Sequence, residues 1–318
     1  MSLKSQKRRQ RTADVLCFLL VILFSCAAML PIWWIFRSSL MSNAELFKWP
    51  PAFFPPRWLF SNYANTLQYF RFWTYLKNTM LIIVPSVVAG TITATMCGYA
   101  FARLRFKLRG FLFTLCIGSM LLPTMVTLVP LYVMWTKFLG LSDTYWPLIL
   151  PYFCGGGAFN IFLIRQFVMS VPRELDEAAT IDGAGYFRIL TSVIVPAIKP
   201  AMIVVAMFLF IQIWNDLLQQ MVYINTEAKF TISMGLSQLK GSLKTDWSAI
   251  MCGTCMSFVP GVVFYLLGQR YFVEGIVMTG MKNWCRAAGR SGWTFLLRSR
   301  AAVGFSICSG RISGSSCG

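Results

Sequence analysis

Six long apolar runs limit what this chain can fold into. Each run is about 20 residues long, the length that an α-helix needs to cross the hydrocarbon core of a bilayer. The runs are Val15–Phe36, Thr79–Phe101, Phe111–Trp135, Tyr145–Ile164, Ala201–Tyr223 and Trp247–Leu267. We therefore expect an all-α, polytopic membrane protein with six transmembrane helices.

The composition agrees with this expectation. Charged residues make up 13% of the chain, whereas soluble domains carry roughly 25%. The net charge of +18 could indicate a nucleic-acid partner. However, the basic residues stand in short clusters between the apolar runs, as they do when they orient a protein in a bilayer. We therefore expect the chain to contact a lipid bilayer and no nucleic acid.

Two basic clusters predict how the spans are oriented. Five Lys or Arg residues lie within residues 1–14, and four more lie within Arg103–Arg109 without an acid. Clusters of this kind stay on the cytoplasmic side of a membrane. Six spans then place both the N- and C-termini in the cytoplasm. The segment Arg37–Lys77 becomes extracytoplasmic, and Arg165–Lys199 becomes cytoplasmic.

The apolar runs and the clusters between them divide the chain into parts. The core holds five spans and contains a cytoplasmic loop at 170–199. The parts are a basic cytoplasmic N-terminus at 1–14, a first transmembrane helix at 15–36, an extracytoplasmic loop at 37–77, the core at 78–274 and an atypical C-terminal tail at 282–318.

Missing residue types narrow the choice of function among channel, ion-coupled carrier, enzyme and pump subunit. Ion-coupled carriers hold protons or cations with ionisable residues inside their spans, and the middle of each apolar run contains none. The sequence has no His and no phosphate-binding Gly-x-x-x-x-Gly-Lys-Ser/Thr loop. We therefore expect neither a metal site nor a catalytic centre. Uphill transport by this chain would need energy from a separate subunit that docks on the cytoplasmic face.

An acidic segment between the fourth and fifth runs fits such a docking role. Gly183 permits a sharp turn between two short helices. Ser170 is expected to cap the start of the first of these helices. The first helix carries its acids near its positive end: Glu174, Asp176 and Glu177. The second helix is expected to carry one apolar face, made of Tyr186, Phe187, Leu190, Val193 and Ile194. The segment therefore predicts a compact helix–turn–helix.

The same segment carries a recognisable pattern. Glu177-Ala178-Ala179 is followed after three residues by Gly183, and Val193-Ile194-Val195-Pro196 follows nine residues later. This pattern resembles the EAA loop of binding-protein-dependent ABC importer permeases, although two Val residues replace the usual Ile and Leu. Asp182 before the Gly is also typical of that family. The resemblance implies that an ATPase subunit is coupled through Glu177, Ala178, Ala179, Asp182, Gly183 and Pro196.

Other segments resemble the carbohydrate branch of this family, in particular the second membrane subunit of the maltose-type transporter. Tyr99–Phe106, which begins within the second run, is similar to a motif of that branch, and Leu121-Leu122-Pro123 is similar to a third-span motif. Trp214-Asn215-Asp216 matches the Trp-Asn-Asp signature of its fifth span. The resemblance covers residues 15–281, which is most of the chain.

The resemblance implies a function and a set of partners. The chain would form half of a translocation path in the bacterial plasma (inner) membrane, together with a second homologous permease subunit. Two copies of a cytoplasmic ATPase subunit would bind ATP and Mg and drive transport, and an extracytoplasmic solute-binding protein would deliver a carbohydrate. The chain itself would be no enzyme and would hold no cofactor.

The role of Trp214, Asn215 and Asp216 stays open at this point. One interpretation places these residues on the solute path or at its outer gate. The other makes them a polar helix end, whose groups need partners within the protein because polar groups in spans are costly.

Three further alternatives stay open. An ABC permease for another solute, such as glycerol phosphate or an amino acid, would carry the same loop. A passive channel would have no use for an ATPase docking helix. The tail at 282–318 departs from the family pattern, and either a reading-frame shift or a genuine extension would account for it. The sequence fixes neither the sugar nor whether the partner permease is a different chain.

Overall fold

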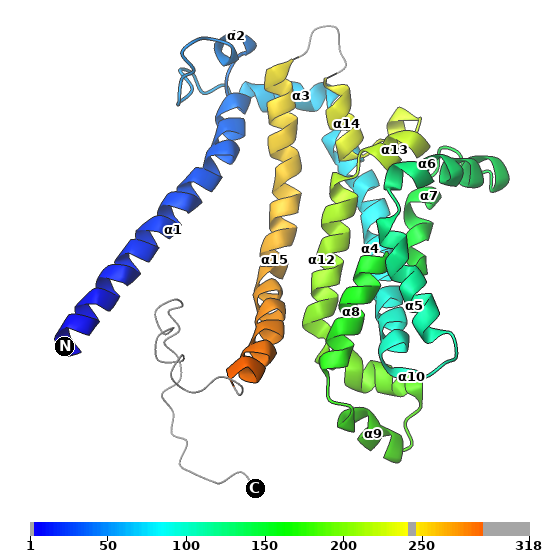
Figure 1. Ribbon diagram of the computed structural model, residues 1–318. Coiled ribbons are helices and arrows are strands. Elements are labelled where there is room, and N and C mark those ends of the chain that lie inside the picture. The colour runs from blue at the N-terminus through cyan, green and yellow to red at the C-terminus, as the bar shows by residue number, and fades with distance from the viewer. Residues whose placement is uncertain (1–2, 241–245, 289–318) are drawn as a thin grey trace. The chain divides into compact units, whose positions relative to one another are not determined.

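The structure is a computed structural model that describes residues 3–240 and 246–288 (Figure 1). Every element assigned within these residues is a helix, so the expected all-α class is confirmed. The chain divides into two units. One consists of Met1–Leu30 with Ile276–Gly318, and the other of Pro31–Gly275.

The helices are named in chain order (Figure 1). The first half contains α1 (Leu3–Ser39), α2 (Asn43–Leu46), α3 (Ser61–Tyr69), α4 (Phe72–Arg103), α5 (Arg109–Gly118), η1 (Ser119–Leu121), α6 (Thr124–Val133), η2 (Met134–Phe138), α7 (Trp146–Ile149) and η3 (Leu150–Cys154). The second half contains α8 (Ala158–Ser170), α9 (Glu174–Ile181), α10 (Tyr186–Ile189), η4 (Leu190–Ile194), α11 (Val195–Ala197), α12 (Lys199–Asn215), α13 (Leu218–Tyr223), η5 (Glu227–Lys229), α14 (Ile232–Gln238) and α15 (Trp247–Ala288).

Four helical segments in the described part of the chain are long and apolar enough to cross a membrane alone: Asp14–Ser39, Phe72–Arg103, Trp146–Ser170 and Trp247–Arg270. Two bent pairs reach that length only together: Arg109–Leu121 with Thr124–Phe138, and Tyr186–Ala197 with Lys199–Asn215. The described residues therefore hold four spans, or six if each bent pair crosses as one. The side of the membrane on which the termini lie stays a prediction.

The third expected span, Phe111–Trp135, is broken in its middle. Pro123 has no amide hydrogen and disfavours a helical conformation in the residue before it, and Leu122 is accordingly extended with ψ 120°. A new helix begins at Thr124, and the two halves meet at 102°. The run is therefore two helices at an angle, and whether they cross the membrane as one span stays a prediction.

The fifth expected span, Ala201–Tyr223, is also shorter than predicted. α12 ends at Asn215, and Asp216 is extended with ψ 113°. The Oδ1 atom of Asp216 accepts a hydrogen bond from the backbone N of Gln219 (3.2 Å), which satisfies a free donor at the start of α13. The polar residues thus end one helix and begin the next.

The first unit contains, within its described residues, the N-terminal part of α1 and the C-terminal part of α15. α15 continues as a helix to Ala288, beyond Lys282, where the tail that departs from the family pattern begins. Residues 289–318 of the expected tail lie outside the described residues.

In the second unit, α4 packs against α8 and α12. Small residues allow close contact between the helices. A Cβ atom added at Gly98 of α4 would lie 2.6 Å from Cγ2 of Ile164 in α8. Two clusters of buried apolar side chains form around this packing. One includes Tyr75 and Ile82 near the start of α4, and the other includes Tyr99 near its end.

The two ends of α4 hold different segments of the second unit. Near its start, Nδ2 of Asn78 donates a hydrogen bond to the carbonyl of Phe230 (3.0 Å). At its end, Arg103 forms an ion pair with Asp176 of α9. Figure 1 accordingly shows α9 and α10 at one end of the α4–α8–α12 group, and α13 and α14 at the other.

Candidate coupling site

A short helical hairpin lies at the C-terminal end of α4. α9 and α10 are joined by a turn in which Gly183 has φ +78°, a conformation that strains residues with a Cβ atom. The backbone N of Gly183 donates to the carbonyl of Thr180 (3.0 Å), and that of Ala184 donates to the carbonyl of Ala179 (2.9 Å). These bonds satisfy carbonyl groups at the end of α9. The segment thus forms the helix–turn–helix that its sequence predicted.

The start of the hairpin differs from the expectation. Ser170 is the last residue of α8, and its Oγ donates to the carbonyl of Phe167 (2.7 Å). The residue before α9 is Arg173, whose side chain makes no capping bond. The predicted Ser170 cap is therefore wrong, because α8 extends further than the sequence indicated. The acids still occupy the first turn of α9, where the helix dipole favours negative charge.

One of these acids fixes the hairpin to α4. Nε of Arg103 lies 2.9 Å from Oδ2 of Asp176, and the two side chains are 7% and 18% exposed. Nη2 of Arg103 also donates to the carbonyl of Val171 (2.6 Å). Burial raises the pKa of Asp176, while the charge of Arg103 opposes that rise. Sequence reasoning missed this pair, because Arg103 was interpreted only as a charge that orients the spans.

The residues that the EAA pattern singled out lie mostly on the outside of the hairpin. Ala179 is partly buried and packs against the apolar cluster that contains Leu190 and Ile194. The others are exposed: Glu177, Ala178, Asp182, Gly183 and Pro196. The arrangement leaves these residues accessible to a partner, and their coupling role stays a prediction.

Large apolar side chains are exposed beside them. Ile181 is 86% exposed, Tyr186 71% and Phe187 70%. Tyr186 and Phe187 are thus the exposed part of the predicted apolar face, whereas Leu190 and Ile194 of the same face are buried. α10 is only four residues long and continues into a π-helix, η4, whose Leu190 and Ile194 face the core. An exposed apolar group of this size beside acids is typical of an interaction site.

The C-terminal end of α12 is formed by Trp214, Asn215 and the following residue, Asp216. Each of the three contacts another residue of the protein. Trp214 stacks on Phe210 at 5.4 Å between ring centroids, and its carbonyl accepts a hydrogen bond from Oγ of Ser233 (3.0 Å). Nδ2 of Asn215 donates to the carbonyl of Ile211 (2.9 Å), and Asp216 caps α13. This geometry agrees with the interpretation as a polar helix end.

The same residues also border open space, as the solute-path interpretation requires. Trp214 and Asn215 line two cavities of about 320 and about 350 Å³. The walls include Ser257 of α15 in both cases. The solute-path role of these residues therefore stays a prediction.

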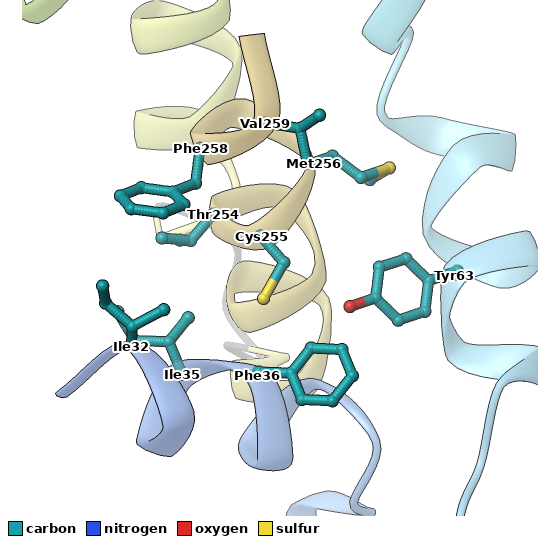
Figure 2. Close-up of a pocket in the computed structure, with 9 residues that line it drawn as sticks. All are labelled: Ile32, Ile35, Phe36, Tyr63, Thr254, Cys255, Met256, Phe258 and Val259. Carbon is teal, nitrogen blue, oxygen red and sulfur yellow. The ribbon is translucent and has the colours of Figure 1, made fainter. Parts of the chain in front are cut away.

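A third cavity, of about 320 Å³, lies between the end of α1, α3 and α15 (Figure 2). Figure 2 shows the sulfur of Cys255 and the ring of Tyr63 facing the same space, which Phe36 borders from α1. The hydroxyl of Tyr63 lies 2.8 Å from Oγ of Ser39. The wall is otherwise largely apolar and holds no charged side chain. It therefore suits an apolar group better than a polar solute.

At the opposite end of α4, Asp143 joins two loops. Its Oδ1 accepts hydrogen bonds from the backbone N of Asn225 (2.9 Å) and of Thr226 (3.1 Å), and its Oδ2 accepts one from Nζ of Lys229 (2.7 Å). The ammonium group of Lys229 and the backbone donors hold the pKa of Asp143 well below its usual range. No local sequence pattern signals this contact, since its partners lie far apart in the chain.

Long apolar helices, two bent helix pairs and an exposed hairpin at one end are the features of a membrane permease subunit. The family described as "Binding-protein-dependent transport system inner membrane component" matches residues 86–276. The chain belongs to this family. Its expected assignment as an inner-membrane transporter subunit, and not an enzyme, is therefore confirmed.

The chain is also similar to individual relatives over most of their length. It is 30% identical to "Probable ABC transporter permease protein YurM" of Bacillus subtilis, covering 87% of this chain and 91% of the relative. It is 30% identical to "Diacetylchitobiose uptake system permease protein NgcG" of Streptomyces coelicolor, covering 82% and 86%. One similar solved structure is a bacterial ABC transporter "involved in the import of the acidic polysaccharide alginate", with TM-score 0.71 and 26% identity, covering 83% of this chain and 98% of that one.

Proposed function

We propose that this chain is one permease subunit of an ATP-driven carbohydrate importer and forms half of its translocation path. Two observations support the solute class. A relative that aligns along most of the chain is named for diacetylchitobiose uptake, and a similar structure is that of an alginate importer. The Trp214-Asn215-Asp216 signature and the Tyr99–Phe106 motif resemble the same branch.

The proposed ATP coupling rests on one observation. The hairpin is exposed, and it is also held firmly against α4. Glu177 offers a charge, and Ile181 and Tyr186 offer apolar area, a combination of the kind found in protein interfaces. The Arg103–Asp176 pair attaches the hairpin to α4. A force applied to α9 by an ATPase subunit would therefore displace a membrane span as part of a rigid body.

The proposed transporter contains further subunits. Two copies of a cytoplasmic ATPase bind ATP and Mg and contact the hairpins. A second homologous permease completes the path, and an extracytoplasmic solute-binding protein delivers the carbohydrate. The Asp143 contact supports this arrangement, because it joins two loops into a defined surface at the end of α4 that lies away from the hairpin.

The experiment that tests this proposal compares Glu177→Lys with Glu227→Lys. Both residues are exposed acids, but Glu227 lies in η5, at the opposite end of α4. We expect Glu177→Lys to abolish ATP-dependent sugar uptake and co-purification of the ATPase, while the membrane subunits still insert. We expect the transporter with Glu227→Lys to keep its ATPase bound. Unchanged uptake and ATPase binding in Glu177→Lys would exclude the docking role.

A further inference from the structure

A cavity of about 600 Å³ lies in the second unit, where several helix breaks meet. Its wall comes from η1 after α5, from the start of α8 and from the C-terminal half of α12. Its volume falls within the range of about 300–1,000 Å³ that small-molecule sites occupy. Neither Trp214 nor Asp216 belongs to its wall.

The turn that leads into α8 is held firmly against α4. Gly155, Gly156 and Gly157 all have positive φ, at 107°, 63° and 100°. A Cβ atom at Gly156 would lie 2.9 Å from the carbonyl oxygen of Gly90 in α4. The backbone N of Gly155 donates to Oγ1 of Thr93, also in α4 (3.1 Å). The start of α8 is thus presented to the cavity by a rigid support.

This start leaves polar groups available in the cavity wall. The residue before α8 is Gly157, which has no side chain to cap the helix, and the first N–H groups of a helix have no acceptor within it. Asn160 is 4% exposed, and its Nδ2 donates to the carbonyl of Gly156 (2.6 Å). The Oδ1 atom of Asn160 has no hydrogen-bond partner among the described residues. This atom is covered by its neighbours, so Asn160 shapes the wall, and the backbone N–H groups of the first turn are the donors that a solute can reach.

The rest of the wall offers amides and rings but no charge. Gln212 and Gln219 provide amide groups, and Ser119 provides a hydroxyl. Tyr152 and Phe208 provide aromatic rings. Amides and hydroxyls can pair with sugar hydroxyls, and rings cover the apolar face of a solute. An ionic solute would lose its hydration here without meeting an opposite charge.

We propose that this cavity is a binding subsite for a neutral sugar unit of the transported solute. The first turn of α8 donates a hydrogen bond to one sugar hydroxyl, and the amide of Gln212 pairs with another and fixes the orientation of the ring from α12. The subsite rests on the carbohydrate function proposed above. It assigns solute contact to Gln212 of α12 in place of the Trp214-Asn215-Asp216 signature.

The main test is uptake of radiolabelled maltose, cellobiose and N,N′-diacetylchitobiose by the complete reconstituted transporter. Gln212→Ala removes an exposed side chain of the wall, so the fold is expected to persist. Loss of one solute hydrogen bond should reduce the uptake rate about tenfold, with the ATPase still bound. Gln166→Ala is the matched control, because Gln166 is exposed on α8 and lies outside the cavity wall. It should retain wild-type uptake.

A second variant tests the chemistry of the wall. Gln212→Lys adds an ammonium group to the wall, which attracts an anionic solute. It should raise the uptake of digalacturonate relative to that of the neutral disaccharides, a change of ratio that a folding defect would not produce. An unchanged ratio counts against solute contact at Gln212.

The outcomes separate the subsite from the function on which it rests. If the wild-type protein imports a disaccharide and Gln212→Ala matches Gln166→Ala, the subsite is wrong and the carbohydrate function stands. If the wild-type protein prefers digalacturonate to every neutral disaccharide, the neutral solute class is wrong. If it imports no sugar at all, the proposed function and the subsite both fall.

Discussion

Arg103 and Asp176 form an ion pair, with 2.9 Å between Nε and Oδ2, that joins the last residue of α4 to the first turn of α9. Both side chains are largely shielded from water. The pair therefore lies at the junction between a membrane span and the hairpin that is predicted to meet the ATPase. It makes the hairpin an extension of α4 rather than a loose loop.

Asp176→Asn should weaken this junction without changing the shape of the side chain. Breaking a buried pair costs about 3–5 kcal/mol, and we expect less here because Asp176 is 18% exposed. The transporter should still hydrolyse ATP while sugar uptake per ATP falls. The measurement is the ratio of the two rates in proteoliposomes.

Two further variants control for this result. Arg105→Ala removes a nearby exposed Arg that forms no part of the pair and should leave the ratio unchanged. The double variant Arg103→Asp with Asp176→Arg restores opposite charges and should recover part of the coupling. If the double variant is as poorly coupled as Asp176→Asn, the pair is not what transmits the motion.

Gly183→Ala should strain the turn of the hairpin. A Cβ atom there would meet nothing within 4 Å, so the cost comes from φ +78° alone, roughly 1–2 kcal/mol. Gly185 is the matched control, because it has φ −75° and equally open surroundings. The midpoint of thermal unfolding and ATPase co-purification should both fall for Gly183→Ala. Equal effects of the two substitutions would show that the positive φ is unimportant.

The sequence predicts the hairpin but not its attachment to α4. Acids followed by Gly183 are a local signal, because the helix dipole and the positive φ act within a few residues. The partner of Asp176 is Arg103, far away in the sequence, and only the packing of α4 beside α9 brings them together. The same reason explains why the contacts of Asp143 went unforeseen.

The membrane spans, like the hairpin, are only partly predictable from the sequence. Apolar length predicts where helices lie, and Pro123 marks a point of weakness. Length alone does not decide whether a Pro bends a helix or ends it, because neighbouring helices can satisfy the freed backbone groups. Pro85 lies within α4 without ending it, whereas the helix breaks at Pro123. The exposure of Phe187 likewise depends on which elements pack around α10, and tertiary packing of this kind is not encoded in a local pattern.

Gly156→Ala should separate α8 from α4. The new Cβ atom would lie 2.9–3.1 Å from backbone atoms of Gly90, which cannot move aside as a side chain can. Overpacking costs about 1–3 kcal/mol, and the positive φ adds to this. Gly140→Ala provides the control, since Gly140 has almost the same φ, +65°, and open surroundings. The difference between the two variants in the midpoint of thermal unfolding measures the clash alone. Equal midpoints would contradict the close approach of Gly156 to Gly90.

Asp143 should make the stability of the protein depend on acid pH. Its folded-state pKa lies below its usual range because of Lys229 and the backbone donors. A carboxylate of this kind stabilises the folded state fully above its unfolded pKa, about 4, and loses this contribution as the pH falls toward the lower folded value. Asp143→Asn removes the charge, so the variant should be less stable than the wild type near neutral pH. The difference between them should shrink below about pH 4. Thermal unfolding of both proteins across this range checks the sign, and a gap that widens in acid would contradict it.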